Sequence, residues 1–360
     1  SRCLGGIVSR VVAAMSGGVD SSVVAGLLLE QGHEVIGVHM KLHDADPDKA
    51  GHCCGLDDAL DARRVADRLG IPFHVMDLRQ AFRKAVMENF TKTYLAGGTP
   101  NPCIQCNGIL KFDVLLKRAI ALGAEYLATG HYARIGDGPC LMQAVDPKKD
   151  QSYFLFPMKT EALKRTLFPL GGMTKPEVRA EAARFGLVTA SKPESQDICF
   201  VPDQDHARVV SEFAPDRDGS GEIVDINGRV VGQHDGYWRF TIGQRRGLGV
   251  AMGKPVYVTS IDPDTAKVTL AGAEALWHEG LIAGGWVWTT IPGEDEIVEA
   301  RIRHRGQRVQ CRVIQDDDNN FRVNFLEPAW AVAPGQAVVI YREDTVLGGG
   351  WIRSAIGEQA

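Results

Sequence analysis

A glycine- and serine-rich turn, Ser16-Gly17-Gly18-Val19-Asp20-Ser21-Ser22, lies between a short apolar run and a stretch with helical apolar spacing. Backbone N–H groups and the positive end of the helix dipole make such a turn an anion-binding site. The two glycines let the backbone approach a phosphate closely. The lysine of the common P-loop pattern, GxxxxGK[ST], is missing, which indicates nucleotide chemistry other than γ-phosphoryl transfer. The alternative is a purely structural turn with a serine N-cap.

Two cysteines lie in polar segments where covalent chemistry is expected. Cys106 belongs to Asn101-Pro102-Cys103-Ile104-Gln105-Cys106-Asn107, which the pattern predicts to be an exposed loop ahead of a helix. Cys199 belongs to Ser195-Gln196-Asp197-Ile198-Cys199-Phe200, outside any long amphipathic pattern. A buried structural thiol is the common alternative for a single cysteine. Two thiols in polar loops of a protein with an anion-binding turn favour covalent chemistry.

Such a combination suits the replacement of oxygen by sulfur. ATP turns a carbonyl oxygen into an adenylate leaving group, and a persulfide on one cysteine delivers the sulfur. A second thiol then cleaves the remaining S–S bond by exchange. An anion-binding turn and two thiols supply the groups that this chemistry requires.

The composition limits the class of protein that positions these residues. A chain of 360 residues suggests two or three domains with a large enzyme-like unit. No run of about 18 apolar residues is present, so we expect a soluble protein whose opening residues form a strand instead of a signal peptide. Eight cysteines without a secretory signal favour the reducing cytoplasm. A net charge of −5 means that any nucleic acid must bind to local basic patches.

Alternating strand and helix patterns predict the architecture of the first part. Helical patterns follow strand patterns repeatedly, which implies a doubly wound parallel α/β sheet. After about residue 151 the pattern is helical, with a helix from the Thr174 N-cap to Phe185, and we expect this segment to lead away from the sheet. Strands are expected at 8–14, 34–40, 72–78 and 126–129, and helices at 23–30, 57–69, 79–94 and 113–122.

Short alternating strands replace the α/β pattern from about Gly219 onward. A hairpin over 256–261 and 267–270 indicates a small β-rich central domain, and a C-terminal β-barrel is expected after it. The barrel strands are expected at 296–304, 307–315, 321–325 and 337–341. The expected domains are a catalytic domain with a helical extension over 1–212, the central domain over 213–277, and the barrel over 278–360.

The sequence SGGVDSS resembles the signature of the PP-loop ATP pyrophosphatase superfamily, whose members cleave ATP between the α- and β-phosphates to adenylate a substrate oxygen. The resemblance implies an ATP site and a catalytic Asp20 that acts through magnesium. Met40 would lie near adenine, with a core methionine as the alternative. Gly130, in the motif ATGHYAR, would form a nucleotide-facing turn. The implied ATP-binding residues are Ala14, Met15, Ser16, Gly17, Gly18, Val19, Asp20, Ser21, Met40 and Gly130.

The motifs SGGVDSS, NPCIQCN, ATGHYAR, KKDQSYFL, ESQDICF and TIGQRRGLG together resemble those of the tRNA-specific 2-thiouridylases. The resemblance spans almost the whole chain, through Pro334–Gln336 and Leu347–Gly350. It implies 2-thiolation of the wobble uridine (U34) of tRNA, with ATP converted to AMP and pyrophosphate. By this resemblance Cys106 is the nucleophile and Cys199 carries the persulfide.

Cys103 stands where many members of that family have aspartate. This departure leaves a second mechanism open, because Cys103, Cys106 and Cys199 could supply three thiolates to a [4Fe–4S] cluster, as in related tRNA thiolation enzymes. A single CxxC is a weak signal for a cluster. Cys53 and Cys54 are also ligand types, but adjacent thiols seldom both bind one ion, and a loop near the active site is the simpler interpretation.

The resemblance also assigns contacts to tRNA. Without it, the charged run at 148–153 would be interpreted as a solvated face. Arg239, Arg245 and Arg246 form a further basic cluster. His304 departs from the aromatic residue that is commoner at its position. The implied tRNA-binding residues are Asn101, Pro102, Cys103, His131, Lys149, Asp150, Gln151, Arg303, His304 and Gln336.

The implied partners are tRNAs that accept Lys, Glu and Gln, together with a persulfide-donating sulfur-relay protein or a cysteine desulfurase; no membrane is expected. Two other classes of function compete with this interpretation. A GMP synthetase would share the phosphate loop, but no convincing glutamine-hydrolysing segment is present. A non-catalytic RNA-binding protein would need neither the phosphate loop nor two loop cysteines.

Overall fold

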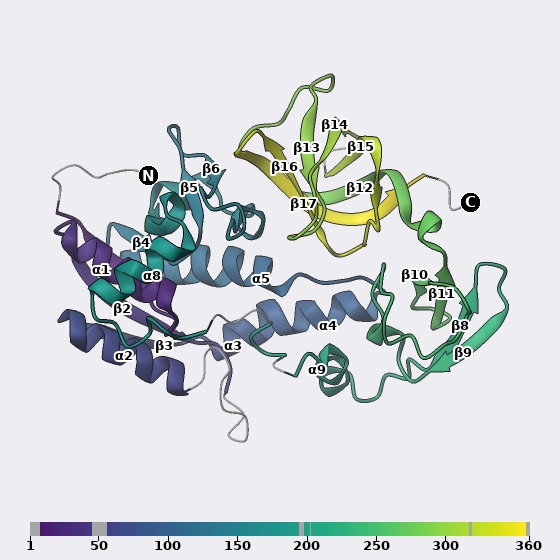
Figure 1. The fold of residues 1–360 in the computed structure, drawn as a ribbon, viewed down its shortest axis with the longest axis horizontal. Helices are drawn as coiled ribbons and strands as arrows, with labels where there is room; N and C mark the ends of the chain where they lie inside the picture. The colour runs from purple at the N-terminus through teal and green to yellow at the C-terminus, as the bar shows by residue number, and fades with distance from the viewer. Residues whose placement is uncertain (1–7, 45–55, 194–197, 202, 317–318, 358–360) are drawn as a thin grey trace. The chain divides into compact units, whose positions relative to one another are not determined.

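The computed structural model describes residues 8–44, 56–193, 198–201, 203–316 and 319–357 (Figure 1). Contacts divide the chain into two compact units. The first contains 1–86, 103–204 and 344–346, and the second contains 87–102, 205–343 and 347–360. Each unit has its own hydrophobic core.

Five parallel strands form the sheet of the first unit, in the spatial order β3-β2-β1-β4-β7. The chain moves outward from β1 to β2 and β3 and then returns to the other side of β1 for β4, as a doubly wound sheet requires. The predicted α/β class is therefore confirmed. The strands are β1 (Arg10–Ala14), β2 (Glu34–Lys41), β3 (Phe73–Asp77), β4 (Tyr126–Ala128) and β7 (Thr166–Leu167).

Three helices share one core with the centre of this sheet: α1 (Val19–Glu30), α2 (Leu56–Leu69) and α8 (Lys175–Arg184). β1 is nearly fully buried, and its apolar side chains contact those of α1. Gly26 of α1 lets α8 approach, because a Cβ there would lie 2.7 Å from the Phe185 ring. The predicted cap of α8 is confirmed, since Thr174 and Glu177 form a capping box.

Two helical runs differ from the predicted boundaries. The first consists of α3 (Arg79–Phe82), a π-helical turn η1 (Arg83–Met87) and α4 (Glu88–Leu95), close to the expected helix. The predicted loop around Cys106 is wrong, because Pro102 begins a helix there. Proline is favoured in a first helical turn, where its missing N–H costs no hydrogen bond. The second helical run consists of α5 (Pro102–Gln105), the π-helical η2 (Cys106–Leu115) and α6 (Leu116–Ala121).

The expectation that the chain leaves the sheet after about residue 151 is wrong for Thr166 and Leu167. These two residues pair with Leu127 and Ala128 and add β7 to the sheet. A strand of two residues has no detectable period of its own, which explains why the pattern missed it. The remaining elements of this unit are β5 (Ala133–Ile135), β6 (Leu141–Gln143), η3 (Ser152–Leu155), α7 (Thr160–Lys164) and η4 (Pro169–Gly172).

The second unit contains a four-stranded sheet in the order β10-β11-β8-β9. The predicted hairpin is confirmed as the antiparallel pair β10 and β11, joined by a turn in which Asp262 accepts hydrogen bonds from Asp264 and Thr265. The elements of this part are α9 (His206–Phe213), β8 (Gly221–Asp225), β9 (Val230–His234), η5 (Tyr237–Arg239), β10 (Tyr257–Asp262), β11 (Lys267–Ala271) and η6 (Ala273–Leu276).

Six antiparallel strands close into the predicted barrel, in the order β12-β15-β14-β13-β16-β17 with β17 paired back to β12. The pattern missed the long strands β12 and β17, because glycine is depleted in strands. Here glycine is required, since a Cβ at Gly284 would lie 2.4 Å from the Arg353 guanidinium and one at Gly348 would lie 2.3 Å from the Trp288 ring. The strands are β12 (Trp277–Trp288), β13 (Val298–Arg301), β14 (Val309–Gln315), β15 (Asn320–Trp330), β16 (Ala337–Arg342) and β17 (Thr345–Ile356).

Within the described part of the chain, none of the helices combines the length and apolar composition needed to cross a bilayer.

Candidate active site

The phosphate loop follows β1 directly, and α1 begins at Val19. Gly17 has a φ of +82°, and a Cβ there would lie 2.2 Å from the backbone oxygen of Asp58 in α2. Only glycine therefore fits between the loop and α2. Gly18 is the N-cap of α1 and offers no side-chain acceptor to the first-turn N–H groups. This geometry suits an anion at the start of the helix.

Gly130 lies where the loop after β4 meets the phosphate loop. A Cβ at Gly130 would lie 2.9 Å from the backbone nitrogen of Ser21, so the two loops approach closely. β1 and β4 are the neighbouring strands at which the direction of the chain through the sheet reverses. Ligands of open α/β sheets bind at the carboxyl ends of the strands at this point. The predicted positions of the phosphate loop and Gly130 thus come together.

Asp20 makes two contacts inside the first unit. Its Oδ1 accepts hydrogen bonds from the ammonium of Lys175, at 2.6 Å, and from the hydroxyl of Tyr132, at 2.9 Å. Lys175 is the first residue of α8 and is only 8 % exposed. Lys175 was not among the predicted site residues. Its place at the predicted start of a helix was the one signal for such a role in the sequence. The helix dipole disfavours a cation at a helix N-terminus, so a lysine there indicates that its charge has another partner.

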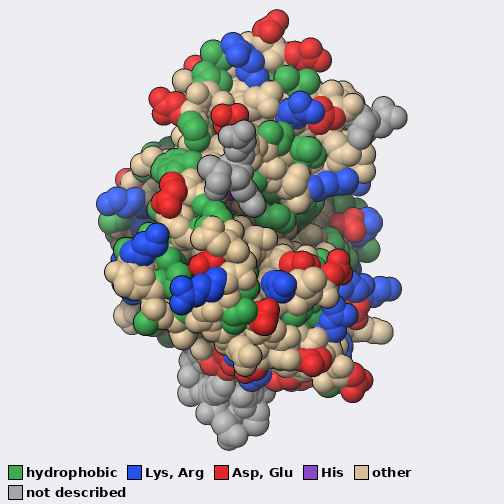
Figure 2. All heavy atoms as spheres, turned by 90° about the vertical axis from the view of Figure 1, so that its right-hand side faces the viewer, with side chains coloured by type: hydrophobic (Ala, Val, Ile, Leu, Met, Phe, Trp, Pro, Cys, Tyr) green, Lys and Arg blue, Asp and Glu red, His purple; other side chains and the backbone are tan. Residues whose placement is uncertain are grey.

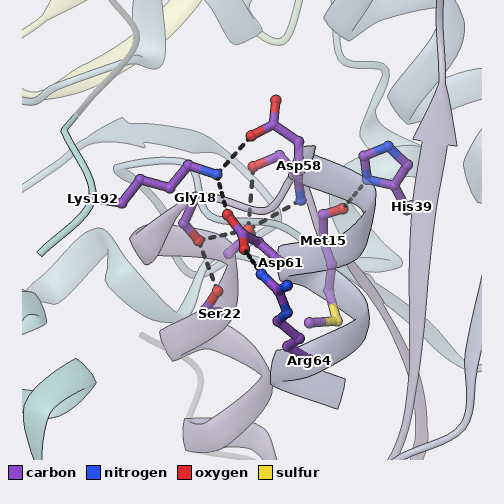
Figure 3. A network of polar contacts seen from close by, with 10 residues as sticks. Met15, Gly18, Ser22, His39, Asp58, Asp61, Arg64 and Lys192 are labelled. Atoms are coloured by element: carbon purple, nitrogen blue, oxygen red, sulfur yellow. Dashed lines mark hydrogen bonds and ion pairs between the residues drawn. The ribbon is translucent and has the colours of Figure 1, made fainter. Parts of the chain in front are cut away.

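The hydroxyls of the loop organise its backbone. Ser21 Oγ accepts a hydrogen bond from the Ser16 N–H at 3.1 Å, and Ser22 Oγ donates to the Gly18 carbonyl at 2.8 Å. His39 Nδ1 donates to the Met15 carbonyl at 2.9 Å, as Figure 3 shows. Burial lowers the pKa of His39, so this imidazole is neutral and its Nδ1 carries the proton. The loop is therefore held in shape by groups of its own chain.

The other predicted ATP-binding residues lie at the carboxyl edge of the sheet. Ala14, Met15 and Val19 are buried, whereas Ser16 is exposed. Met40 is half-buried near the end of β2, opposite Met76 of β3. This placement is compatible with a contact to adenine, which stays a prediction.

Cys106 is the first residue of the π-helical turn η2 and is half-buried. π-Helical segments are rare, and those found inside α-helical runs frequently lie at functional sites. Burial raises the pKa of the Cys106 thiol, and the Lys111 ammonium offsets part of this effect. The resting thiol is therefore protonated at neutral pH. Cys103 is exposed one turn earlier.

His131 lies in a buried polar chain next to the phosphate loop. Lys111 Nζ donates to His131 Nε2 at 3.3 Å, so Nδ1 carries the proton and donates to Thr129 Oγ1 at 2.7 Å. Burial, followed by the charge of Lys111, holds the pKa of His131 well below its usual value. The ring is therefore neutral and fixed in one tautomer.

Cys199 is half-buried in a turn, in which the Val201 N–H donates to the Ile198 carbonyl at 2.8 Å. The next residue, Phe200, is buried and packs edge-on against Phe82 of α3, with ring centroids 5.5 Å apart. The turn and this aromatic contact hold Cys199 at the surface of the first unit's core.

Among the residues that the structure describes, no group of three or more His, Cys, Asp or Glu side chains could hold a metal ion. Cys103, Cys106 and Cys199 are all described and do not form a cluster site in this arrangement. Cys53, Cys54, Ser195 and Gln196 lie outside the described residues.

The predicted tRNA-binding run of the first unit surrounds a buried carboxylate. Asp150 accepts hydrogen bonds from Gln143, from the Ala144 N–H and from both the N–H and the hydroxyl of Ser152. Gln151 Oε1 accepts from the Tyr132 N–H at 3.0 Å. Asp150 and Gln151 therefore shape this loop, while Lys149 is half-buried. Contacts of these residues with tRNA stay predictions.

The predicted tRNA-binding residues of the second unit lie on three segments, at 101–102, 303–304 and 336. Gln336 Nε2 donates to the carbonyls of Thr99 and Pro100, each at 3.2 Å, and so fixes the backbone that leads into Asn101 and Pro102. The Arg303 guanidinium lies over the Trp330 ring, 5.3 Å from its centroid. His304, the next residue in the chain, is half-buried.

On the face shown in Figure 2, basic and acidic side chains are interspersed, in agreement with the net charge of −5.

Comparison with protein families gives three matches that follow one another along the chain. A tRNA methyl transferase HUP domain matches residues 9–203, a tRNA methyl transferase PRC-barrel domain matches residues 208–272, and an aminomethyltransferase β-barrel domain matches residues 278–352. The first match alone covers more than half of the chain. This order corresponds to the parallel sheet, the central β-rich part and the closed barrel.

Curated relatives match along nearly the whole chain. The tRNA-specific 2-thiouridylase MnmA of Geotalea uraniireducens is 51% identical over 359 residues, which cover 96% of each chain. The protein of the same name from Geobacter metallireducens is 49% identical over 97% of this chain and 98% of that one. The one from Carboxydothermus hydrogenoformans is 48% identical over 96% of this chain and 98% of that one. With near-complete coverage on both sides and this level of identity, the chain belongs to the family of tRNA-specific 2-thiouridylases.

Proposed function

We propose that the protein catalyses the ATP-dependent 2-thiolation of uridine at the wobble position (U34) of tRNA. One observation carries the proposal: a phosphate loop with a charged carboxylate, Asp20, shares a compact unit with Cys106 and Cys199. An anion site supplies the activation step, and two thiols supply the transfer of sulfur. Family membership supports tRNA as the substrate.

In the first step, the C2 oxygen of uridine attacks the α-phosphorus of ATP. The bond to the bridging oxygen breaks, pyrophosphate leaves, and the N3 proton of the base is lost to solvent. The first turn of α1 would bind the phosphates, and Asp20 would hold magnesium, which neutralises phosphate charge when bound. The Lys175 ammonium forms an ion pair with Asp20 and supplies a positive charge that the phosphate loop itself does not contain.

In the second step, the terminal sulfur of a Cys199 persulfide attacks C2, and AMP leaves with the former C2 oxygen. The tRNA is then joined to Cys199 through a disulfide. The Cys106 thiolate attacks the Cys199 sulfur, the sulfur on C2 leaves as the thiocarbonyl of 2-thiouridine, and N3 is reprotonated. The resulting Cys106–Cys199 disulfide takes two electrons and two protons from an external thiol reductant. Alternatively, Cys106 releases the persulfide sulfur as sulfide, which attacks the same adenylate.

The partners are those that the family resemblance implies, and the compartment is inferred from the thiol chemistry. The substrates would be tRNAs that accept Lys, Glu and Gln, and the persulfide sulfur would come from a sulfur-relay protein or a cysteine desulfurase. Thiol chemistry of this kind requires a reducing compartment, which favours the cytoplasm. The alternative in which Cys103, Cys106 and Cys199 hold a [4Fe–4S] cluster is distinguished by iron and acid-labile sulfide assays after anaerobic purification.

Release of pyrophosphate with and without tRNA tests the proposal. We expect pyrophosphate only when tRNA with an unmodified U34 is present, and equal amounts of AMP and 2-thiouridine when a persulfide donor is added. A GMP synthetase-like enzyme would release pyrophosphate without tRNA when given its nucleotide substrate. A non-catalytic RNA-binding protein would bind tRNA and release none. Either result would exclude the proposed reaction.

A further inference from the structure

Lys111 is a half-buried lysine in η2, the π-helical segment that begins at Cys106. In a regular α-helix with 3.6 residues per turn, the residue five positions further on is rotated by about 140° from the first. Hydrogen bonds in a π-helix instead join residues that are five positions apart, so a π turn brings such a pair back to the same side. Lys111 follows Cys106 by one π turn and therefore lies on the same side of the helical run.

The Lys111 ammonium has no carboxylate partner among the residues that the structure describes. Within the same residues, its only side-chain hydrogen bond is the one to His131 Nε2, at 3.3 Å. Because His131 is neutral, it accepts this hydrogen bond without compensating the positive charge. A partly buried cation without a counter-ion favours an anion that forms nearby. The Cys106 thiol is a group that can become such an anion.

The structure shows that the charge of Lys111 acts on Cys106. Burial raises the pKa of the Cys106 thiol, and the positive charge of Lys111 opposes this effect. Loss of the lysine would leave burial alone and would make the thiolate harder to form. The π turn and the unpaired ammonium therefore have one consequence in common, which is to favour the thiolate.

Charged groups on the elements packed against η2, which are α3, α6 and η3, are paired or exposed to solvent. Arg79 of α3 binds two carboxylates. On α6, Lys117 pairs with Asp113, and Arg118 is exposed. Asp150, which precedes η3, is held by the hydrogen bonds described above. The charges of these groups are therefore compensated or screened by water, whereas the ammonium in η2 is not paired with a carboxylate.

We infer that Lys111 stabilises the thiolate of Cys106 in the step that releases the product. The inference rests on the proposed function, in which the Cys106 thiol loses its proton to solvent and its thiolate attacks the Cys199 sulfur. The S–S bond to the sulfur on tRNA breaks, and an S–S bond between the two cysteines forms. An ammonium beside the thiol increases the fraction of thiolate at neutral pH and so speeds this exchange.

Alkylation of Cys106 in the full-length protein measures the charge beside the thiol. Neutral iodoacetamide reports the amount of reactive thiolate, whereas the anion iodoacetate is in addition attracted by a nearby cation. The ratio of the iodoacetate rate to the iodoacetamide rate therefore reports the local charge, and tandem mass spectrometry distinguishes label on Cys106 from label on Cys103. In the wild type this ratio should be higher at Cys106 than at Cys140, a half-buried thiol between β5 and β6.

Lys111→Gln removes the charge and keeps an N–H donor for His131. We expect the iodoacetamide rate at Cys106 to fall by about threefold to tenfold at about pH 8, because fewer thiols are ionised while each thiolate is intrinsically more reactive. The ratio of the two rates should fall by about twofold to fivefold. Lys111→Arg keeps the charge and should keep the ratio. Lys117→Ala, which removes an exposed ion pair of α6, is the matched control and should change neither rate.

A single turnover of enzyme with a persulfide on Cys199 follows the exchange itself. The tRNA joined to Cys199, detected by electrophoresis without reductant, should accumulate in Lys111→Gln because its release slows by about threefold to tenfold. An unchanged alkylation ratio in Lys111→Gln would overturn the inference, because a purely structural effect slows both reagents equally. If that variant does not fold, a wild-type ratio at Cys106 no higher than at Cys140 overturns it. If the wild type forms neither the joined tRNA nor 2-thiouridine, the proposed function fails, and the alkylation ratio reports separately on Lys111.

Discussion

Lys175 and Asp20 form an ion pair across 155 residues of sequence, with Nζ 2.6 Å from Oδ1. The phosphate loop of this protein contains no lysine, and α8 supplies one from a distant part of the chain. Tyr132 also contacts Asp20 and lies 5.7 Å from the Lys175 ammonium, measured to the ring centroid. The positive charge beside the phosphate loop therefore depends on the packing of α8 against α1.

Replacement of Lys175 by alanine is expected to weaken ATP binding and slow adenylation. A hydrogen bond to a charged group contributes about 1.5–3 kcal/mol, which corresponds to a loss of about tenfold to a hundredfold. The measurement is the ATP dependence of pyrophosphate release. Lys164→Ala, which removes an exposed pair with Glu161, is the control. Unchanged kinetics in Lys175→Ala would mean that this lysine only stabilises the fold around Asp20.

Asp20→Ala is expected to abolish adenylation and leave tRNA binding largely intact. The substitution removes the carboxylate that would direct magnesium and does not alter the basic residues that would bind tRNA. Pyrophosphate release and tRNA binding should be measured on the same preparation. A loss of tRNA affinity equal to the loss of rate would contradict the assignment of Asp20 to catalysis.

The sequence was sufficient to predict the doubly wound sheet, because strand and helix periods alternate clearly from Arg10 to Ala128. It was not sufficient for β7, whose two residues are too few to show a period, or for β12 and β17, whose glycines are kept for close packing. The local pattern around Cys106 also misled, since Gly, Pro and Asn indicated a loop while Pro102 actually begins a helix.

The candidate site could be predicted where a motif is continuous. Ser16–Ser22 is continuous, and the structure places it at the carboxyl end of β1. Lys175 could not be found in this way, because it contacts α1 only after the chain has folded. Contacts between distant residues leave no local period in the sequence.

Lys149→Ala is expected to weaken the binding of all substrate tRNAs to a similar extent. A lysine that contacts a phosphate contributes no base recognition, and its loss should reduce the slope of log affinity against log salt by about one. Binding of several tRNAs over a range of salt concentrations is the measurement. An effect confined to one tRNA would indicate that Lys149 contacts a base.

Stability is expected to fall as the pH drops below the usual histidine pKa of 6.5. The pKa of buried His131 is lowered in the folded protein, so below 6.5 the unfolded chain binds a proton that the folded protein does not bind. Each unit of pKa difference costs about 1.4 kcal/mol. Denaturant unfolding at about pH 7.5 and about pH 5.5 should show a smaller difference for His131→Gln than for the wild type. Equal differences would mean that other groups cause the acid sensitivity.

Cys103→Ala distinguishes the two thiol mechanisms. If Cys106 and Cys199 act alone, this variant should keep most of its activity, because Cys103 is exposed and takes no part in the exchange. A three-thiolate cluster would instead lose iron and activity together. An inactive Cys103→Ala variant, together with about four irons per wild-type chain, would show that the cluster alternative is correct.

The proposed order of events, with Cys199 loaded before Cys106 acts, can be followed by mass spectrometry of the persulfide in single variants. With a persulfide-donating sulfurtransferase present, Cys106→Ser should still carry a persulfide on Cys199 yet yield no 2-thiouridine. Cys199→Ser should carry no persulfide and should also be inactive, because serine cannot hold the terminal sulfur. A persulfide that forms on Cys106 in the Cys199→Ser variant, or 2-thiouridine produced by either variant, would contradict the account.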